Sequence, residues 1–272
     1  MALQRLQQTL VHLTGGESKA QSPGAGLSLL HGSTDTPLWN MTLSKLLHER
    51  MCADPTRDCI VFPEFGHRST YEQLYNRSRQ VAKGLLASGI QQGDHIGVLA
   101  GNCPPYVELL FATSHVGAAL VVLNNTYAPS ELESAVRAAS AFLYALQICN
   151  WQLNCVDCKL LFTAPNIGTV SNAERLDMLA ASAGGGLPDL REIVLVRPDP
   201  GRRSKPFLTY YDCIARGTSV SSADLDRRME AVQPDDVCNL QFTSGTTGSP
   251  KAALLTHKYV LRRALINNDA HA

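Results

Sequence analysis

The chain has 272 residues, of which 44% are hydrophobic and 18% charged, a composition typical of a soluble globular protein with a substantial core. Its 24 basic and 24 acidic residues cancel, so neither nucleic acid nor an anionic membrane is indicated as a partner. No run of about 18 apolar residues occurs, and we therefore predict no integral membrane segment.

The first residues differ from the rest, being rich in Ser, Gly, Gln and Leu. We predict a flexible leader over residues 1–37. A mitochondrial presequence is the alternative, but it would be Arg-rich and acid-poor. The leader has only Arg5 and Lys19 as basic residues and includes Glu17. The compartment therefore stays open among cytoplasm, mitochondrion and peroxisome.

From residue 38 onward, helical and strand patterns alternate. The expected helices cover residues 42–51, 71–85, 106–116, 130–139, 172–181, 207–215 and 224–229. The expected strands cover residues 58–62, 96–100, 118–123, 160–164, 193–196 and 237–242. Several of these strands are continuously apolar, as in sheets that are covered on both faces. The pattern predicts an α/β fold with a mostly parallel, helix-covered sheet.

Local signals fix several boundaries. Thr42 can cap the first helix, and the second can begin with a capping box from Ser69 or, in a second register, from Thr70. Gly89 is a plausible C-cap. His115 lies within an apolar helix, where we expect a packed ring with its hydrogen bonds satisfied.

The eight cysteines occur without a signal peptide, so we expect reduced thiols. Cys155 and Cys158 form a Cys-x-x-Cys pair, but no second pair and no suitably spaced histidines accompany it. A thioredoxin-like context is missing too. We interpret the pair as incidental thiols and predict no metal site.

A loop made almost entirely of Thr, Ser and Gly follows the strand at 237–242 and ends in Pro250-Lys251. Glycine lets backbone N–H groups approach an anion, hydroxyls add donors, and Lys251 adds a positive charge. A helix expected directly after Lys251 and running through Leu265 would add its positive end. These features predict phosphate binding.

Two other interpretations of the loop are weaker. A Walker A loop, and with it a conventional phosphate-loop NTPase, requires Gly, four residues and then Gly-Lys-Ser/Thr. Here Gly245 and Gly248 are three residues apart and Pro250 precedes the lysine. A Ser/Gly linker rarely follows a strand directly or ends in Pro-Lys.

The string Thr-Ser-Gly-Thr-Thr-Gly-Ser-Pro-Lys at 243–251 resembles the signature of AMP-forming acyl-CoA synthetases, within the adenylate-forming family. The family usually has Gly after the lysine, where this chain has Ala252. The resemblance implies that the loop holds the ATP triphosphate while a carboxylate attacks the α-phosphate. An acyl-adenylate then passes its acyl group to coenzyme A, and Mg2+ assists. The resemblance assigns phosphate binding to Thr243, Ser244, Gly245, Thr246, Thr247, Gly248 and Lys251. It assigns no catalytic residue and no metal ligand to this chain.

Two more segments, 93–98 and 116–124, resemble family motifs and occur in the same order along the chain. Within the family, the sequence as a whole most resembles medium-chain fatty acyl-CoA synthetases. The resemblance covers about residues 40–140 and 155–257. Residues 141–154 stand out as an apolar insert. We interpret the insert as a translated intron or another gene-model error, or as a lengthened helix packed on the core.

Family enzymes are about twice as long and add a small C-terminal domain. The resemblance therefore implies that residues 38–272 are a partial AMP-binding domain, the N-terminal part of the large domain, with the C-terminal domain absent. One hypothesis is that the chain is a fragment of an acid–thiol ligase that activates a carboxylic acid, specifically a fatty acid. Under this hypothesis the fragment is inactive alone and holds at most the phosphates of ATP. The alternative is a non-enzymatic module that binds nucleotide weakly or pairs with a full-length relative.

Overall fold

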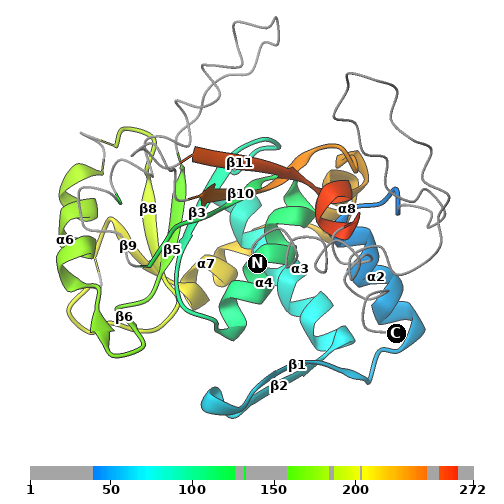
Figure 1. The fold of residues 1–272 in the computed structure, drawn as a ribbon, viewed down its shortest axis with the longest axis horizontal. Helices are drawn as coiled ribbons and strands as arrows, with labels where there is room; N and C mark the ends of the chain where they lie inside the picture. Colours follow the sequence, from blue (N-terminus) through cyan, green and yellow to red (C-terminus); the bar gives the residue numbers. More distant parts are fainter. Residues whose placement is uncertain are drawn as a thin grey trace, which may run out of the picture. The chain divides into compact units, whose positions relative to one another are not determined.

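The computed structural model describes residues 39–125, 132, 158–183, 187–202, 204–243 and 251–262. Its centre is a seven-stranded sheet in the order β11-β10-β4-β3-β5-β8-β9 (Figure 1). The strands of this sheet are β3 (His95–Leu99), β4 (Ala119–Val122), β5 (Leu160–Thr163), β8 (Glu192–Leu195), β9 (Phe207–Thr209), β10 (Val237–Thr243) and β11 (Lys251–Thr256). All neighbouring strands are parallel except β10 and β11. The predicted α/β fold with a mostly parallel sheet is confirmed.

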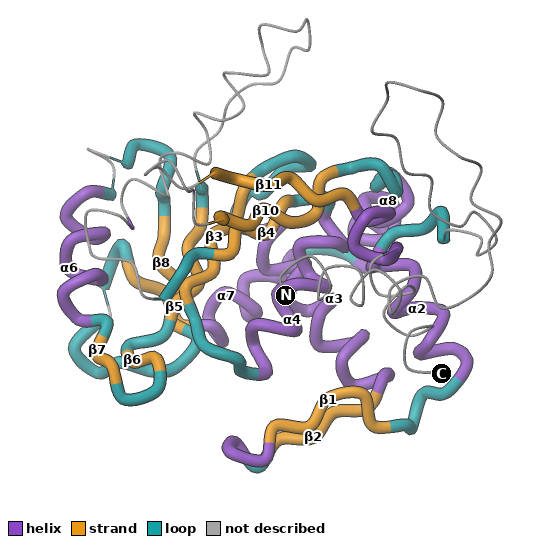
Figure 2. Tube along the Cα trace, in the orientation of Figure 1, coloured by secondary structure: helices purple, strands orange, loops and turns teal. Residues whose placement is uncertain are grey.

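Helices pack around this sheet, and two short antiparallel strand pairs lie outside it (Figure 2). The α-helices are α2 (Leu43–Ala53), α3 (Tyr71–Ala87), α4 (Pro104–Val116), α6 (Ala173–Ser182), α7 (Tyr210–Arg216) and α8 (Ser222–Ala231). Two 3-10 turns accompany them, η1 (Pro63–Phe65) and η2 (Gly217–Ser219). The pairs are β1 (Asp58–Phe62) with β2 (His67–Thr70), and β6 (Asn166–Ile167) with β7 (Val170–Ser171). Among the described residues, no helix is long and apolar enough to cross a bilayer.

The two faces of the sheet bury separate hydrophobic clusters, because side chains alternate along each strand. On one face, Ile96 of β3 and Phe162 of β5 lie in the cluster that includes buried residues of α3, α4, α7 and α8. On the other face, Leu161 and Ile193 lie in the cluster that includes Leu176 of α6. Helices on both faces explain why these strands are apolar throughout.

Most of the residues predicted to begin or end a helix do so in the structure. The side chain of Thr42 accepts a hydrogen bond from the Lys45 backbone N–H at 3.1 Å and caps α2. At α3 the second register is the right one, because Thr70 and Gln73 form the reciprocal capping box. Gly89 follows the end of α3 at a φ of +78°, a left-handed conformation that glycine adopts without strain.

Two predicted helices are wrong in part. The first three residues of the expected 207–215 helix form β9, which pairs in parallel with β8, and α7 begins only at Tyr210. The helix expected directly after Lys251 is instead β11, which runs antiparallel to β10. Helical backbone follows from residue 257, at the far end of that strand. Ala252 is therefore in a strand, and no helix start directly follows the phosphate loop.

His115 is fully buried and satisfied, as predicted. One ring nitrogen, Nδ1, lies 2.7 Å from the Ser44 hydroxyl, and the other, Nε2, lies 2.9 Å from the Ser78 hydroxyl. This ring therefore ties α2 and α3 to α4. The leader at 1–37, the insert at 141–154 and the 130–139 helix apart from Leu132 lie outside the described residues.

Candidate functional site

The two ends of the phosphate loop lie side by side. Thr243 is the last residue of β10 and Lys251 the first of β11, and the two are paired in the antiparallel register. The predicted site residues between them, Ser244, Gly245, Thr246, Thr247 and Gly248, lie outside the described residues. The structure thus brings together the residues that open and close the loop.

The loop begins at the edge of the sheet where the parallel strands end. β10 pairs in parallel with β4, so that Gln241 lies opposite Val122. Asn124 and Asn125 follow β4 at this edge, and both are exposed. Ligands of open α/β sheets bind outside the carboxyl ends of the strands. Asn124 ends the segment 116–124 that resembles a family motif, but neither asparagine is among the site residues predicted from the sequence. Polar residues directly after an apolar strand are the signal for such an edge.

A pocket of about 310 Å³ lies farther along the same edge. It follows β3, β5 and β8, which are adjacent in the sheet, and we call it the carboxyl-edge pocket. Its lining residues are Phe65, Ala100, Gly101, Asn102, Cys103, Ala164, Asn166, Ile167, Gly168, Val196 and Arg197. The chain crosses from β4 over β3 to β5, and such a reversal of strand order is the usual position of a ligand crevice.

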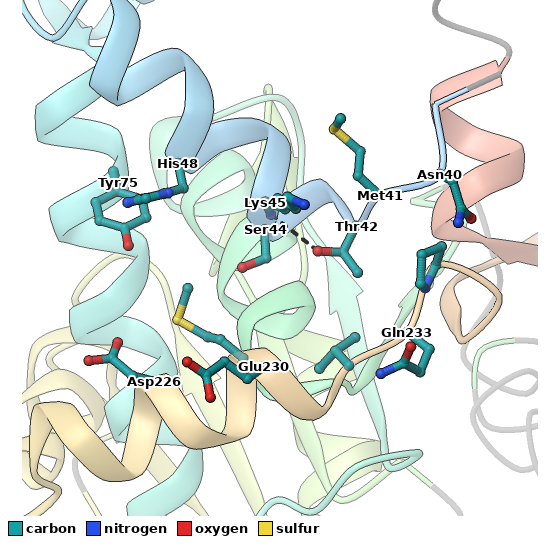
Figure 3. Close-up of a pocket in the computed structure, with 13 residues that line it drawn as sticks. Asn40, Met41, Thr42, Ser44, Lys45, His48, Tyr75, Asp226, Glu230 and Gln233 are labelled. Carbon is teal, nitrogen blue, oxygen red and sulfur yellow. Dashed lines mark hydrogen bonds between the residues drawn. The ribbon is translucent and has the colours of Figure 1, made fainter. Parts of the chain in front are cut away.

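A larger hollow, of about 540 Å³, lies at the opposite edge (Figure 3). Its lining includes Val232 and Gln233, which precede β10, together with side chains from α2, α3 and α8. Figure 3 shows Lys45 and Glu230 among its polar residues. Because it adjoins the amino end of β10, this hollow is not part of the phosphate loop.

His257 lies at that opposite edge as well. It follows β11, whose last residue Thr256 pairs with Val237 at the start of β10. Its Nδ1 accepts a hydrogen bond from the Leu43 backbone N–H at 3.3 Å, and burial lowers its pKa to about 4. Thr256, which precedes it, lies at the other end of β11 from Lys251, roughly 17 Å away at the usual rise of a strand. The neutral ring therefore anchors the start of α2, at the end of β11 opposite to Lys251.

The described residues contain no group of three or more His, Cys, Asp or Glu side chains that could hold a metal ion. The described cysteines form no disulfide with one another. Cys158 is buried under the sheet in one of the hydrophobic clusters, whereas Cys155 lies outside the described residues.

Comparison with known proteins identifies the family. The sequence model of the family described as "AMP-binding enzyme" matches residues 47–270. The acyl-CoA ligase SID4 of Ajellomyces capsulatus is 42% identical over 98% of this chain, which covers 41% of that protein. The mitochondrial medium-chain acyl-CoA ligase ACSF2 of Danio rerio is 32% identical over 89% of this chain, which covers 38% of that protein. The chain thus spans about two fifths of the length of these curated relatives.

Solved structures show the same fold. The anthranilate CoA ligase AuaEII, crystallised with anthranoyl-AMP, matches 82% of this chain with a TM-score of 0.58 at 24% identity, over 36% of its own length. A putative long-chain-fatty-acid CoA ligase from Rhodopseudomonas palustris matches 84% of this chain with a TM-score of 0.59 at 17% identity, over 48% of its own length. The chain belongs to the AMP-binding enzyme family, in agreement with the resemblance of its phosphate loop.

Proposed function

We propose that this chain is part of an AMP-forming acid–thiol ligase that activates a carboxylic acid with ATP and transfers the acyl group to coenzyme A. The observation that carries the proposal is the pairing of Thr243 with Lys251 at the base of the loop. The family match over residues 47–270 and the acyl-CoA ligase names of the relatives support it.

In the proposed reaction, a carboxylate oxygen of the acid attacks the α-phosphorus of ATP and pyrophosphate leaves. The thiol of coenzyme A then attacks the acyl carbon, and AMP leaves. Lys251 would neutralise charge on the phosphate oxygens, and the hydroxyls of Thr243, Ser244, Thr246 and Thr247 would donate to them. Gly245 and Gly248 would let backbone N–H groups approach.

The acid is proposed to be a fatty acid of medium length. This substrate class rests on the resemblance of the whole sequence to medium-chain enzymes and on the relative named as a medium-chain acyl-CoA ligase. ATP, coenzyme A and Mg2+ are the proposed requirements of the complete enzyme. We further propose that residues 38–272 form a partial AMP-binding domain. Of these three ligands, this domain would hold only the phosphates of ATP.

The chain alone is proposed to bind nucleotide without turning it over. Charge developing in the transition state must be met by a complete set of fixed donors, and this chain covers only 41% of the relative SID4. The proposed phosphate-loop residues would contact phosphate, and none of them is proposed as a catalytic group.

Two measurements on the 272-residue chain test this. Titration with ATP should raise the melting temperature, because a ligand that binds only the folded state stabilises it. Pyrophosphate release from ATP, octanoate and coenzyme A should stay at the level of the buffer blank, with a complete acyl-CoA ligase as the positive control. Robust release would contradict the inactivity, and no thermal shift at millimolar ATP would contradict the phosphate site.

A further inference from the structure

The carboxyl-edge pocket holds one positive charge and no negative one among its described lining residues. Arg197 follows β8, and its guanidinium carbon lies 4.6 Å from the centroid of the Phe65 ring. Among the described residues, Arg197 has no carboxylate within ion-pair distance. Its neighbours Asp199 and Arg202 pair with each other instead. A stacked arginine without a carboxylate is a ready partner for an anion.

The remaining lining residues divide into polar and apolar parts. The side-chain amides of Asn102 and Asn166 can each donate two hydrogen bonds. Ile167 and Val196 supply apolar wall. Burial raises the pKa of the Cys103 thiol, so this side chain adds no negative charge at neutral pH. The pocket volume of about 310 Å³ is within the range of pockets that bind small molecules.

The start of α4 borders the pocket but does not supply its donors. Its first two residues are Pro104 and Pro105, and neither has a backbone N–H. Cys103 caps this helix without a side-chain hydrogen bond. Side chains from three separate loops, and not a helix terminus, therefore make up the polar part of the pocket.

We propose that the carboxyl-edge pocket binds a small organic anion, with a phosphate or carboxylate group against Arg197 and an apolar remainder against Ile167 and Val196. This site is separate from the phosphate loop. β4 lies between β10 and β3, which is the strand of the pocket nearest to β10, and two strand spacings amount to about 10 Å. The proposal does not depend on the proposed ligase activity.

Calorimetric titration of the 272-residue chain tests this, with phenyl phosphate and benzoate as the probes for the two anion types. Arg197→Gln should weaken the tighter probe at least tenfold, since a charge-assisted hydrogen bond contributes about 1.5–3 kcal/mol. Arg197→Lys should recover part of the affinity. Arg57→Gln is the matched control, because Arg57 is also exposed but lies in the turn before β1. It should bind like the unaltered chain.

Two further variants separate the possible outcomes. Asn166→Asp places a carboxylate in the pocket at an exposed position and should also weaken binding, which keeps the test valid if Arg197→Gln fails to fold. Lys251→Ala should leave the binding that depends on Arg197 unchanged. Loss of affinity in Lys251→Ala together with full affinity in Arg197→Gln would place the anion at the phosphate loop and overturn the proposal. Absence of heat for both probes would overturn it as well.

Discussion

Thr243 and Lys251 face each other across the β10–β11 ladder, so the loop between them starts and ends at neighbouring strands. Neighbouring strands lie about 4.8 Å apart. The base of the loop is therefore fixed by the sheet before any ligand binds, which reduces the ordering cost of binding. The position of Lys251 follows from strand pairing and not from a helix start.

Replacing Lys251 by alanine should weaken ATP binding by tenfold to a hundredfold, because a charge-assisted hydrogen bond contributes about 1.5–3 kcal/mol. The readout is the ATP concentration needed for half of the maximal rise in melting temperature. Lys45→Ala is the charge-matched control, since Lys45 lines the hollow at the opposite edge of the sheet. Equal weakening in both variants would show a general charge effect and contradict the assignment.

The hydrogen bonds around His115 define its tautomer. The Ser78 hydroxyl donates to the Tyr75 carbonyl oxygen at 2.9 Å, so it must accept from Nε2–H of His115. Nδ1 then accepts from the Ser44 hydroxyl. The ring is neutral in the folded state, and burial lowers its pKa to about 3, from an ordinary value of 6.5.

This lowered pKa predicts acid sensitivity. Below pH 6.5 the unfolded chain binds a proton at His115 that the folded chain does not bind, so stability is complete above pH 6.5 and falls as the pH is lowered toward 3. At pH 4.5 the loss should be about 3 kcal/mol. His115→Gln should lower stability at pH 7 but reduce its decline with acid, measured by urea unfolding from pH 7 to 4.5. Parallel curves for the two proteins would refute the assignment.

Tyr210 and Glu108 form a buried pair between α7 and α4. The Tyr210 hydroxyl donates to Oε2 of Glu108 at 2.6 Å, and the Arg77 Nε lies at 4.0 Å from the same oxygen. Burial raises the pKa of Glu108, so removing its donor leaves a poorly compensated carboxyl group.

Tyr210→Phe should therefore lower the free energy of unfolding by about 1–3 kcal/mol. Adding Glu108→Gln should restore part of this loss, because the remaining group carries no charge to compensate. Tyr211→Phe is the matched control, since Tyr211 is 67% exposed, and it should change stability little. The measurement is chemical unfolding at pH 7 of the unaltered chain, Tyr210→Phe, Glu108→Gln, the double variant and the Tyr211→Phe control. Additive effects of Tyr210→Phe and Glu108→Gln would argue against the pairing.

Gly84 permits the close approach of α3 to α7. A Cβ atom at this position would lie 2.3 Å from the backbone oxygen of Cys213, which no side-chain rotation can relieve. Gly84→Ala should cost about 2 kcal/mol of stability despite the better helix propensity of alanine. Gly201→Ala is the control, because its Cβ would meet only an Asp199 side-chain oxygen at 3.5 Å. Thermal unfolding measures both, and equal melting temperatures would contradict the steric argument.

The sequence predicted the central part of the fold well. The segment from β3 through α4 to β4 was placed within two residues at each end, because continuous apolar strands are bounded there by Gly and Pro signals. β9 was missed because a strand as short as Phe207–Thr209 forms only through pairing with β8. β11 was missed because the run after Lys251 is apolar without a clear period and fits either structure.

The candidate sites differ in how far the sequence can predict them. The phosphate loop is a single contiguous string, so its residue types and spacing could be recognised. The carboxyl-edge pocket combines Phe65, Asn166 and Arg197, which come from three distant segments. No local pattern connects such residues, and only the strand order places them together.

The pairing of β10 with β4 also bears on how the protein is made. It joins Leu120 to Asn239, residues far apart in the chain, whereas β3 and β4 pair locally. During synthesis, the ribosome must therefore add more than a hundred residues before the free edge of β4 is covered. Uncovered strand edges promote association between nascent chains, and non-local pairs form late. The nascent chain should depend most on chaperones during this interval.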